Sequence, residues 1–365
     1  MTAHVQHQTT PTLHWVDIMR GLGITAVVIG HSGAPSHLVG FVYLYHLALF
    51  LFLSGYLYKD TYARAFGLFL RRRLRSLYVP FLGYQFAFLL LHNAFFALGL
   101  YSTSAAGRYP VAPYTLPEAA HVAGGILTLS ATEQMGGALW FVMVILTASM
   151  LFGGMSALAR LLPRHADLLR MVLAALCVAG GLWQLYPFGV PSFVNTSLVG
   201  LAFIYAGYWY KKAEKRIPLS LPAAGLCILL LWWLAGRGEY AYLGSVSYSA
   251  WWVFLTAPLA GIYANVVVAR RLKANRVLEL LGRQSFTIMA LHFLAFKAVI
   301  LLQMLFIPGD TDRLASFPVW SGSDGWWLVS SLFGLALPVA AGLAAARVRV
   351  FAVMRFRPTR DGAEW

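Results

Sequence analysis

The sequence predicts an all-α integral membrane protein, a bundle of about ten transmembrane helices with both termini in the cytoplasm. Two observations support this fold class. Of the 365 residues, 59% are hydrophobic and 11% charged, with a mean hydropathy of +0.68, whereas soluble proteins carry about 25% charged residues. The net charge of +15 lies in short basic clusters between apolar stretches. That distribution is typical of membrane topology and argues against a nucleic-acid partner.

Ten apolar stretches are long enough to span a bilayer, some of them interrupted by glycine or proline. They are 17–34, 41–58, 79–99, 138–161, 168–186, 194–210, 219–235, 247–269, 284–306 and 326–346. Basic clusters follow every second stretch, whereas the alternate loops hold only Arg108, Arg237 and Arg313. By the positive-inside rule, the basic loops and both termini are cytoplasmic.

The sequence divides into three segments: a polar N-terminal tail over 1–14, a membrane domain over 15–348 and a basic cytoplasmic C-terminal tail over 349–365. The polar start is no signal peptide, so the first apolar stretch is expected to direct insertion. Cys177 and Cys227 lie inside apolar stretches, which predicts buried thiols and neither a disulfide nor a metal site. The sequence contains no P-loop, zinc-ligand spacing or dinucleotide-binding glycine motif.

The first stretch carries an acid and a base near its start and a histidine near its end: Asp17, Arg20 and His31. Eleven helical steps amount to about 1100°, so Arg20 and His31 share nearly the same face, roughly 16 Å apart along the axis. Asp17 precedes Arg20 by three residues and can pair with it. Ionisable groups in an apolar helix are costly and are usually functional. The alternative is an arginine that sets topology and an isolated interfacial histidine.

Two later stretches add ionisable residues. His46, in the second stretch, is expected at a depth comparable with that of His31, which predicts a polar pocket, although an isolated interfacial histidine would give the same pattern. The small pair Ser54-Gly55 favours close helix packing. In the ninth stretch, His292 and Lys297 are expected to face the bundle interior because exposure to lipid would be costly.

A basic cluster at the inner surface contains Arg72, Arg73 and Arg75. Arg72 and Arg75 are one helical turn apart, and guanidinium groups at that spacing can fork onto phosphate oxygens. The alternative is a cluster that stops transfer and touches anionic lipid head groups. The spacing favours neither interpretation.

The longest outer loop, residues 100–137, is long enough to form a lid or a re-entrant segment over the pocket. Its acidic residues Glu118 and Glu133 are expected to be solvated. Trp140, where the next helix begins, is expected to anchor the chain at the membrane interface.

Four segments of the chain resemble membrane acyltransferase family 3, and within it the polysaccharide O-acetyltransferase branch, which includes the exopolysaccharide acetyltransferases of xanthan assembly. The segments are Val16-Asp17 with Met19-Arg20-Gly21 through Gly30-His31, His46-Leu47-Ala48-Leu49-Phe50 through Ser54-Gly55-Tyr56, Arg72-Arg73-Leu74-Arg75 before Pro80, and Leu139-Trp140-Phe141 together with Ser285 to His292. The chain departs from the family pattern after His46, where Leu47-Ala48 replaces Met-Pro.

The resemblance implies an O-acetyltransferase of the bacterial inner membrane that uses cytoplasmic acetyl-CoA and no metal. The acceptor would be a sugar hydroxyl of a lipid-linked oligosaccharide or an exported polysaccharide, and other proteins of polysaccharide assembly would be partners. His31 would be the catalytic base, and Arg20 with Asp17 would hold the inner end of the channel. Arg72, Arg73 and Arg75 would bind the CoA phosphates, and His46, Trp140 and His292 would contact substrate.

Two other functions fit the same stretches. A permease or flippase could use His31 and Arg20 as a proton or substrate relay. A non-catalytic membrane scaffold would leave His31 without a role. For an enzyme, the residues leave open whether His31 acts as a base in a direct transfer or carries the acetyl group covalently.

Overall fold

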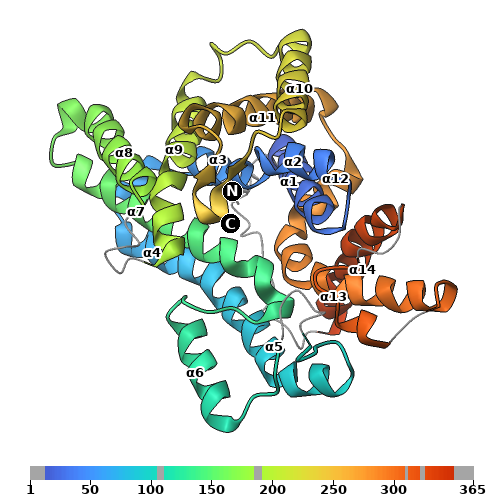
Figure 1. Ribbon diagram of the computed structural model, residues 1–365. Helices are drawn as coiled ribbons and strands as arrows, with labels where there is room; N and C mark the ends of the chain where they lie inside the picture. The colour runs from blue at the N-terminus through green and yellow to red at the C-terminus, as the bar shows by residue number, and fades with distance from the viewer. Residues whose placement is uncertain (1–12, 105–110, 185–190, 309–310, 321–324, 349–365) are drawn as a thin grey trace, which may run out of the picture.

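The computed structural model describes residues 13–104, 111–184, 191–308, 311–320 and 325–348, and these form a bundle of helices (Figure 1). A helix occupies each of the ten predicted stretches. These helices are α1 (His14–His31), α3 (His46–Tyr56), α5 (Val79–Ala97), α7 (Trp140–Ala159), α8 (Ala166–Leu182), α9 (Ser192–Ala213), α10 (Leu221–Gly236), α11 (Trp251–Leu272), α13 (Ser285–Phe306) and α14 (Trp326–Val348). The predicted helical architecture is therefore confirmed for the described part of the chain. Arg108 and the two tails, 1–12 and 349–365, lie outside it.

Shorter elements connect these helices. They are α2 (Ser36–Tyr43), η1 (Asp60–Ala63), α4 (Phe66–Arg73), η2 (Leu74–Tyr78), α6 (Leu116–Leu127), η3 (Gln134–Leu139), η4 (Pro163–His165), η6 (Leu243–Ser245), α12 (Arg276–Arg283) and η7 (Thr311–Ala315). The described chain also contains one small antiparallel hairpin, in which β1 (Ala241–Tyr242) pairs with β2 (Ser247–Tyr248).

Seven described helical segments are long and apolar enough to cross a membrane. They are Ser36–Tyr56, Phe66–Ala97, Gln134–Ala159, Pro163–Leu182, Trp251–Leu272, Ser285–Phe306 and Trp326–Arg347. Of the other predicted spans, α1 contains Asp17 and Arg20, α9 carries two lysines in its last turn, and α10 has 16 residues. The number of ten spans and the cytoplasmic orientation of the termini stay predictions.

The second predicted stretch is not one continuous helix, because the chain turns at Leu44 and Tyr45 between α2 and α3. Tyr45 leaves the helical region with a φ of −146°. Its ring packs so closely on α11 that a Cβ on Gly261 would lie 2.3 Å from the Tyr45 Cβ. This tertiary contact accompanies the break and makes His46 the first residue of α3 instead of an interior residue of a longer helix.

Glycines let two pairs of helices approach closely. At the crossing of α1 and α12, a Cβ on Gly21 would meet the carbonyl of Leu278, and a Cβ on Gly282 would meet that of Asp17. The Ser54-Gly55 prediction is confirmed at the crossing of α3 and α9, where a Cβ on Gly55 would meet the carbonyl of Ile204. Small residues at such crossings bring helix backbones together and increase van der Waals contact within a membrane. The α1–α12 crossing places the start of α1 in a buried position.

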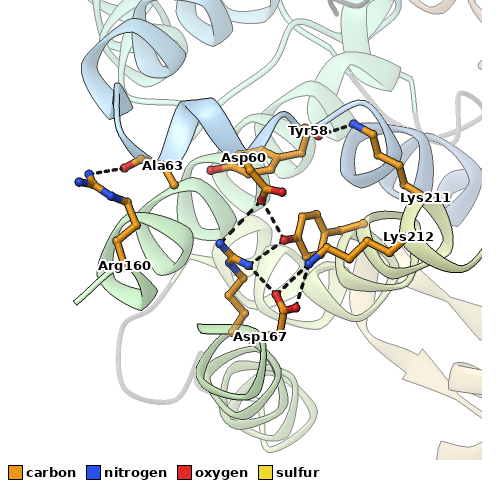
Figure 2. A network of polar contacts seen from close by, with 9 residues as sticks. Tyr58, Asp60, Ala63, Arg160, Asp167, Lys211 and Lys212 are labelled. Carbon is orange, nitrogen blue, oxygen red and sulfur yellow. Dashed lines mark hydrogen bonds and ion pairs between the residues drawn. The ribbon is translucent and has the colours of Figure 1, made fainter. Parts of the chain in front are cut away.

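Charged side chains connect the segment after α3 to α8 and α9 (Figure 2). Arg170 donates to Asp167 and to the Tyr208 hydroxyl, each at 2.7 Å, and Tyr208 in turn donates to Asp60 at 2.9 Å. Lys212 donates to both oxygens of Asp167 at 2.9 Å. Some of the basic residues expected to set topology therefore also hold neighbouring helices together.

Candidate active site

The structure brings together three histidines that are distant in the sequence. His31 ends α1, His46 begins α3, and His292 lies within α13. Nδ1 of His31 is 3.2 Å from Nε2 of His292, and the two rings stack with centroids 5.3 Å apart. The Tyr43 ring contacts both His31 and His46, at centroid distances of 6.3 and 4.9 Å. The predicted interior position of His292 is confirmed, since its side chain is fully buried, as is that of Lys297.

Hydrogen bonds assign the tautomers of the neutral imidazole rings. Nδ1 of His292 lies 2.9 Å from the carbonyl oxygen of Ile288, which can only accept, so this nitrogen carries the hydrogen. Nε2 of neutral His292 is then an acceptor, and Nδ1–H of His31 donates to it. The remaining nitrogen of His31, Nε2, therefore keeps its lone pair. The same reasoning leaves Nε2 of His46 unprotonated, because its Nδ1–H donates to Val42 at 2.7 Å.

His31 and His46 line a cavity of about 190 Å³. At one end its wall includes Leu77 and Ser285, which follow the arginine-rich segments before α5 and α13. At the other end the wall includes Trp140 and residues of the β1–β2 hairpin. The part between is mostly apolar, with Phe50, Ile145 and Met289 among its side chains. Trp140, expected as an interfacial anchor, is therefore also part of this wall. Of the described part of the 100–137 loop, no residue lines the cavity.

Asp17 and Arg20 lie on the face of α1 that lines the cavity, but nearer to the start of the helix than the lining residues. Ile24, Val27 and His31 line the cavity, and Arg20 is one turn before Ile24 on that face. Arg20 Nη1 donates to Asp17 Oδ1 at 3.1 Å, and both residues are buried beside α12. The predicted Asp17–Arg20 pair is confirmed. Arg283 of α12 approaches the same carboxylate at 3.8 Å, so this end of α1 is held in an ionic cluster next to the cavity.

The three arginines predicted to hold CoA phosphates have different surroundings. Arg73 is buried, and its Nη2 donates to the Ser54 hydroxyl of α3 at 3.0 Å. Arg72 is half-buried and donates to the Tyr62 hydroxyl, whereas Arg75 is exposed. Arg75 lies in the π-helical turn η2, two residues before Leu77 in the cavity wall. Among the three, Arg75 offers the most accessible guanidinium near this end of the cavity.

Sequence comparison supplies the family. A family model described as an acyltransferase domain, Acyltransferase 3, matches residues 13–345. The chain belongs to this acyltransferase family. The matched region contains all three histidines, the Asp17–Arg20 pair and the arginine cluster. Searches of curated proteins and of solved structures give no match.

The acyltransferase also contains a buried histidine–glutamate pair that the sequence did not suggest. Glu133, expected to be solvated, is 1% exposed, and its Oε2 lies 2.8 Å from Nδ1 of His92. Nε2–H of His92 donates to the carbonyl of Ala112, and the Tyr114 ring stacks on the imidazole at 3.6 Å between centroids. Burial and the nearby Glu133 carboxylate raise the pKa of Tyr114 to about 12, so its hydroxyl stays neutral at physiological pH.

This pair fixes the segment that leads into the cavity wall. The backbone N–H of Glu133 donates to Gln85 of α5, and Gln85 donates to the carbonyl of Gly136 in η3. These bonds hold η3 on α5 directly before Trp140. The 100–137 loop was predicted as a lid or re-entrant segment. Its described helix α6 packs on α5, and none of the loop's described residues lines the cavity, so the described part of the loop does not form a lid over it. The re-entrant path stays a prediction.

Proposed function

We propose that this acyltransferase transfers an acetyl group from cytoplasmic acetyl-CoA to a sugar hydroxyl of a lipid-linked oligosaccharide or an exported polysaccharide in the bacterial inner membrane. The observation that carries the proposal is one cavity that extends from the arginine-bearing segment to the Trp140 end, with His31 in its wall. The two ends differ in their surroundings: Arg75 and Arg283 precede the lining residues Leu77 and Ser285 at one end without lining the cavity themselves, and the rings of Trp140 and Tyr242 line the other.

The donor is proposed to bind at the arginine end. Arg75 and Arg72 would hold CoA phosphates, since guanidinium groups bind phosphate oxygens through paired, charge-assisted hydrogen bonds. Apolar side chains such as Phe50 and Ile145 line the path from there to His31. This wall suits a thioester-bearing arm that carries no charge, and it excludes water from the reacting thioester.

His31 is proposed as the general base. Its Nε2 lone pair takes the proton from the sugar hydroxyl as the hydroxyl oxygen attacks the acetyl carbonyl carbon. The carbon–sulfur bond then breaks, the acetyl ester forms, and the proton passes from His31 to the CoA sulfur. His292 holds Nδ1–H of His31 and so keeps Nε2 unprotonated before each turnover. A covalent acetyl-His31 intermediate would use the same lone pair.

Release of CoA by the purified protein tests the proposal. We expect CoA to be released faster when sugar acceptors are present, with radiolabel from acetyl-CoA recovered on the acceptor as an ester. His31→Gln, which keeps a hydrogen-bonding side chain but cannot take the proton, should abolish the acceptor-dependent release. Label that stays on the wild-type protein after an acid quench without acceptor would indicate the covalent route.

The permease or flippase alternative has a distinct outcome. The acyltransferase match over residues 13–345 supports the enzyme instead. Movement of a sugar-containing substrate across vesicles by protein that never releases CoA would overturn the proposal and favour transport.

A further inference from the structure

The β1–β2 hairpin forms one wall of the cavity. Tyr242, Leu243, Gly244 and Ser245 all line it, together with Trp140. Two side chains hold this turn from outside: Thr196 of α9 donates to the Gly244 carbonyl and Gln184 donates to the Val246 carbonyl, each at 3.2 Å. The hairpin is therefore bonded to the helical bundle at both sides of its turn, which gives the wall a defined shape.

Trp140 and Gly244 meet across this end of the cavity. A Cβ on Gly244 would lie 3.0 Å from the outer edge of the Trp140 indole, so the backbone of the hairpin touches the ring directly. Trp140 is half-buried and lines the same cavity. A Cβ at position 244 would require the indole to move by a few tenths of an ångström, and a branched side chain would require a larger shift. The glycine thus sets how far the indole can extend along the wall.

Aromatic contacts lead from the hairpin to the histidines. The Tyr242 ring meets the Tyr43 ring edge to face at 5.4 Å, and Tyr43 contacts the rings of His46 and His31. A group lying against Trp140 and Tyr242 is therefore close to His31, the proposed base. Among the described residues that line the cavity, none is an aspartate, glutamate, lysine or arginine. A charged ligand would lose its hydration there without gaining an ionic partner.

We propose that the hairpin, Trp140 and Tyr43 form the acceptor subsite, and that it selects an uncharged pyranose ring over charged sugars and over simple alcohols. A pyranose presents apolar C–H faces that pack on aromatic rings and hydroxyls that bond to groups such as Ser245 and Tyr242. The inference rests on the proposed function. It assigns acceptor specificity to the β1–β2 hairpin, to Trp140 of α7 and to Tyr43 of α2.

An acceptor panel tests the substrate class. Purified protein is supplied with acetyl-CoA and one of three probes: methyl glucoside, methyl glucuronide or 1-hexanol. We expect acetylated methyl glucoside to form at least about tenfold faster than either other product. 1-Hexanol lacks the ring that packs on Trp140, and methyl glucuronide must bury a charge without an ionic partner; each difference is worth about tenfold in rate. Equal rates for the three probes, or preference for the uronate or the alcohol, would overturn the inference while leaving acyl transfer established. Absence of CoA release with every probe would instead count against the proposed function.

Variants test the named residues. Gly244→Val, which displaces the indole, and Trp140→Leu, which removes it, should each raise the KM for methyl glucoside about tenfold and reduce its preference over 1-hexanol. Gly154→Val is the matched control, because a Cβ on Gly154 of α7 meets no atom within 4 Å. A glucoside preference unchanged in both Gly244→Val and Trp140→Leu would overturn the assignment. So would a rise in the acetyl-CoA KM larger than the rise in the glucoside KM. Trp140→Leu adds no bulk, so it tests the assignment even where Gly244→Val does not fold.

Discussion

The hydrogen bond between His31 and His292 gives the most specific prediction about catalysis. His292→Phe removes the acceptor that keeps the hydrogen of His31 on Nδ1, while retaining an aromatic ring in a fully buried position. The net contribution of such a bond is about 0.5–1.5 kcal/mol, and an unsatisfied buried donor costs about 1–3 kcal/mol. Because 1.36 kcal/mol corresponds to about tenfold in rate, kcat should fall roughly 10- to 100-fold.

Rescue separates this positioning role from a packing role. In His292→Gln the side-chain carbonyl can accept the His31 Nδ1–H, so this variant should recover part of the lost rate, whereas Phe should not. The assay is the steady-state rate of acetyl transfer, with melting temperature as a check on folding. His121→Gln on exposed α6 is the matched control and should behave as wild type.

Non-additivity gives a second readout. Removal of a positioned base costs about 10²–10⁴-fold, and His292 acts through that base. Adding His292→Phe to His31→Ala should therefore slow the reaction no further. A double variant slower by the product of the two single effects would refute the reasoning. So would His292→Phe with a rate within twofold of wild type.

Three further predictions follow. His31→Ala should lower the rate of transfer about 10²–10⁴-fold while the protein still inserts and melts normally; full acetylation in cells that carry only this form would show that His31 is not the base. Arg75→Ala should raise the KM for acetyl-CoA more than Arg71→Ala does, where Arg71 is an exposed neighbour in the same cluster. Equal KM values for the two variants would indicate that Arg75 only sets membrane topology. Glu133→Leu leaves Nδ1 of buried His92 without its hydrogen-bond partner, so it should cost about 1–3 kcal/mol of stability and lower the melting temperature more than Glu118→Leu; similar melting temperatures would contradict the buried pair.

The sequence by itself determined the helical architecture and much of the first helix of the site. Hydropathy is a sum over neighbouring residues, so apolar stretches locate helices without knowledge of their partners. The helical period likewise predicted the Asp17–Arg20 pair, since three residues bring both side chains to one face. The same local patterns placed His292 and Lys297 in the interior.

Only the tertiary structure decided which of these residues meet. His31 and His292 are 261 positions apart, and no local period relates them, so their bond depends on how α1 packs against α13. Glu133 was misjudged for the same reason, because its burial depends on His92 of α5 and not on the polar loop around it. The hairpin at one end of the cavity is another such feature, since it forms a wall there together with Trp140 and Tyr43, which lie on α7 and α2. The residues of one stretch set how stable its helix is in lipid. The site depends on contacts between different helices, and no single stretch of sequence specifies those contacts.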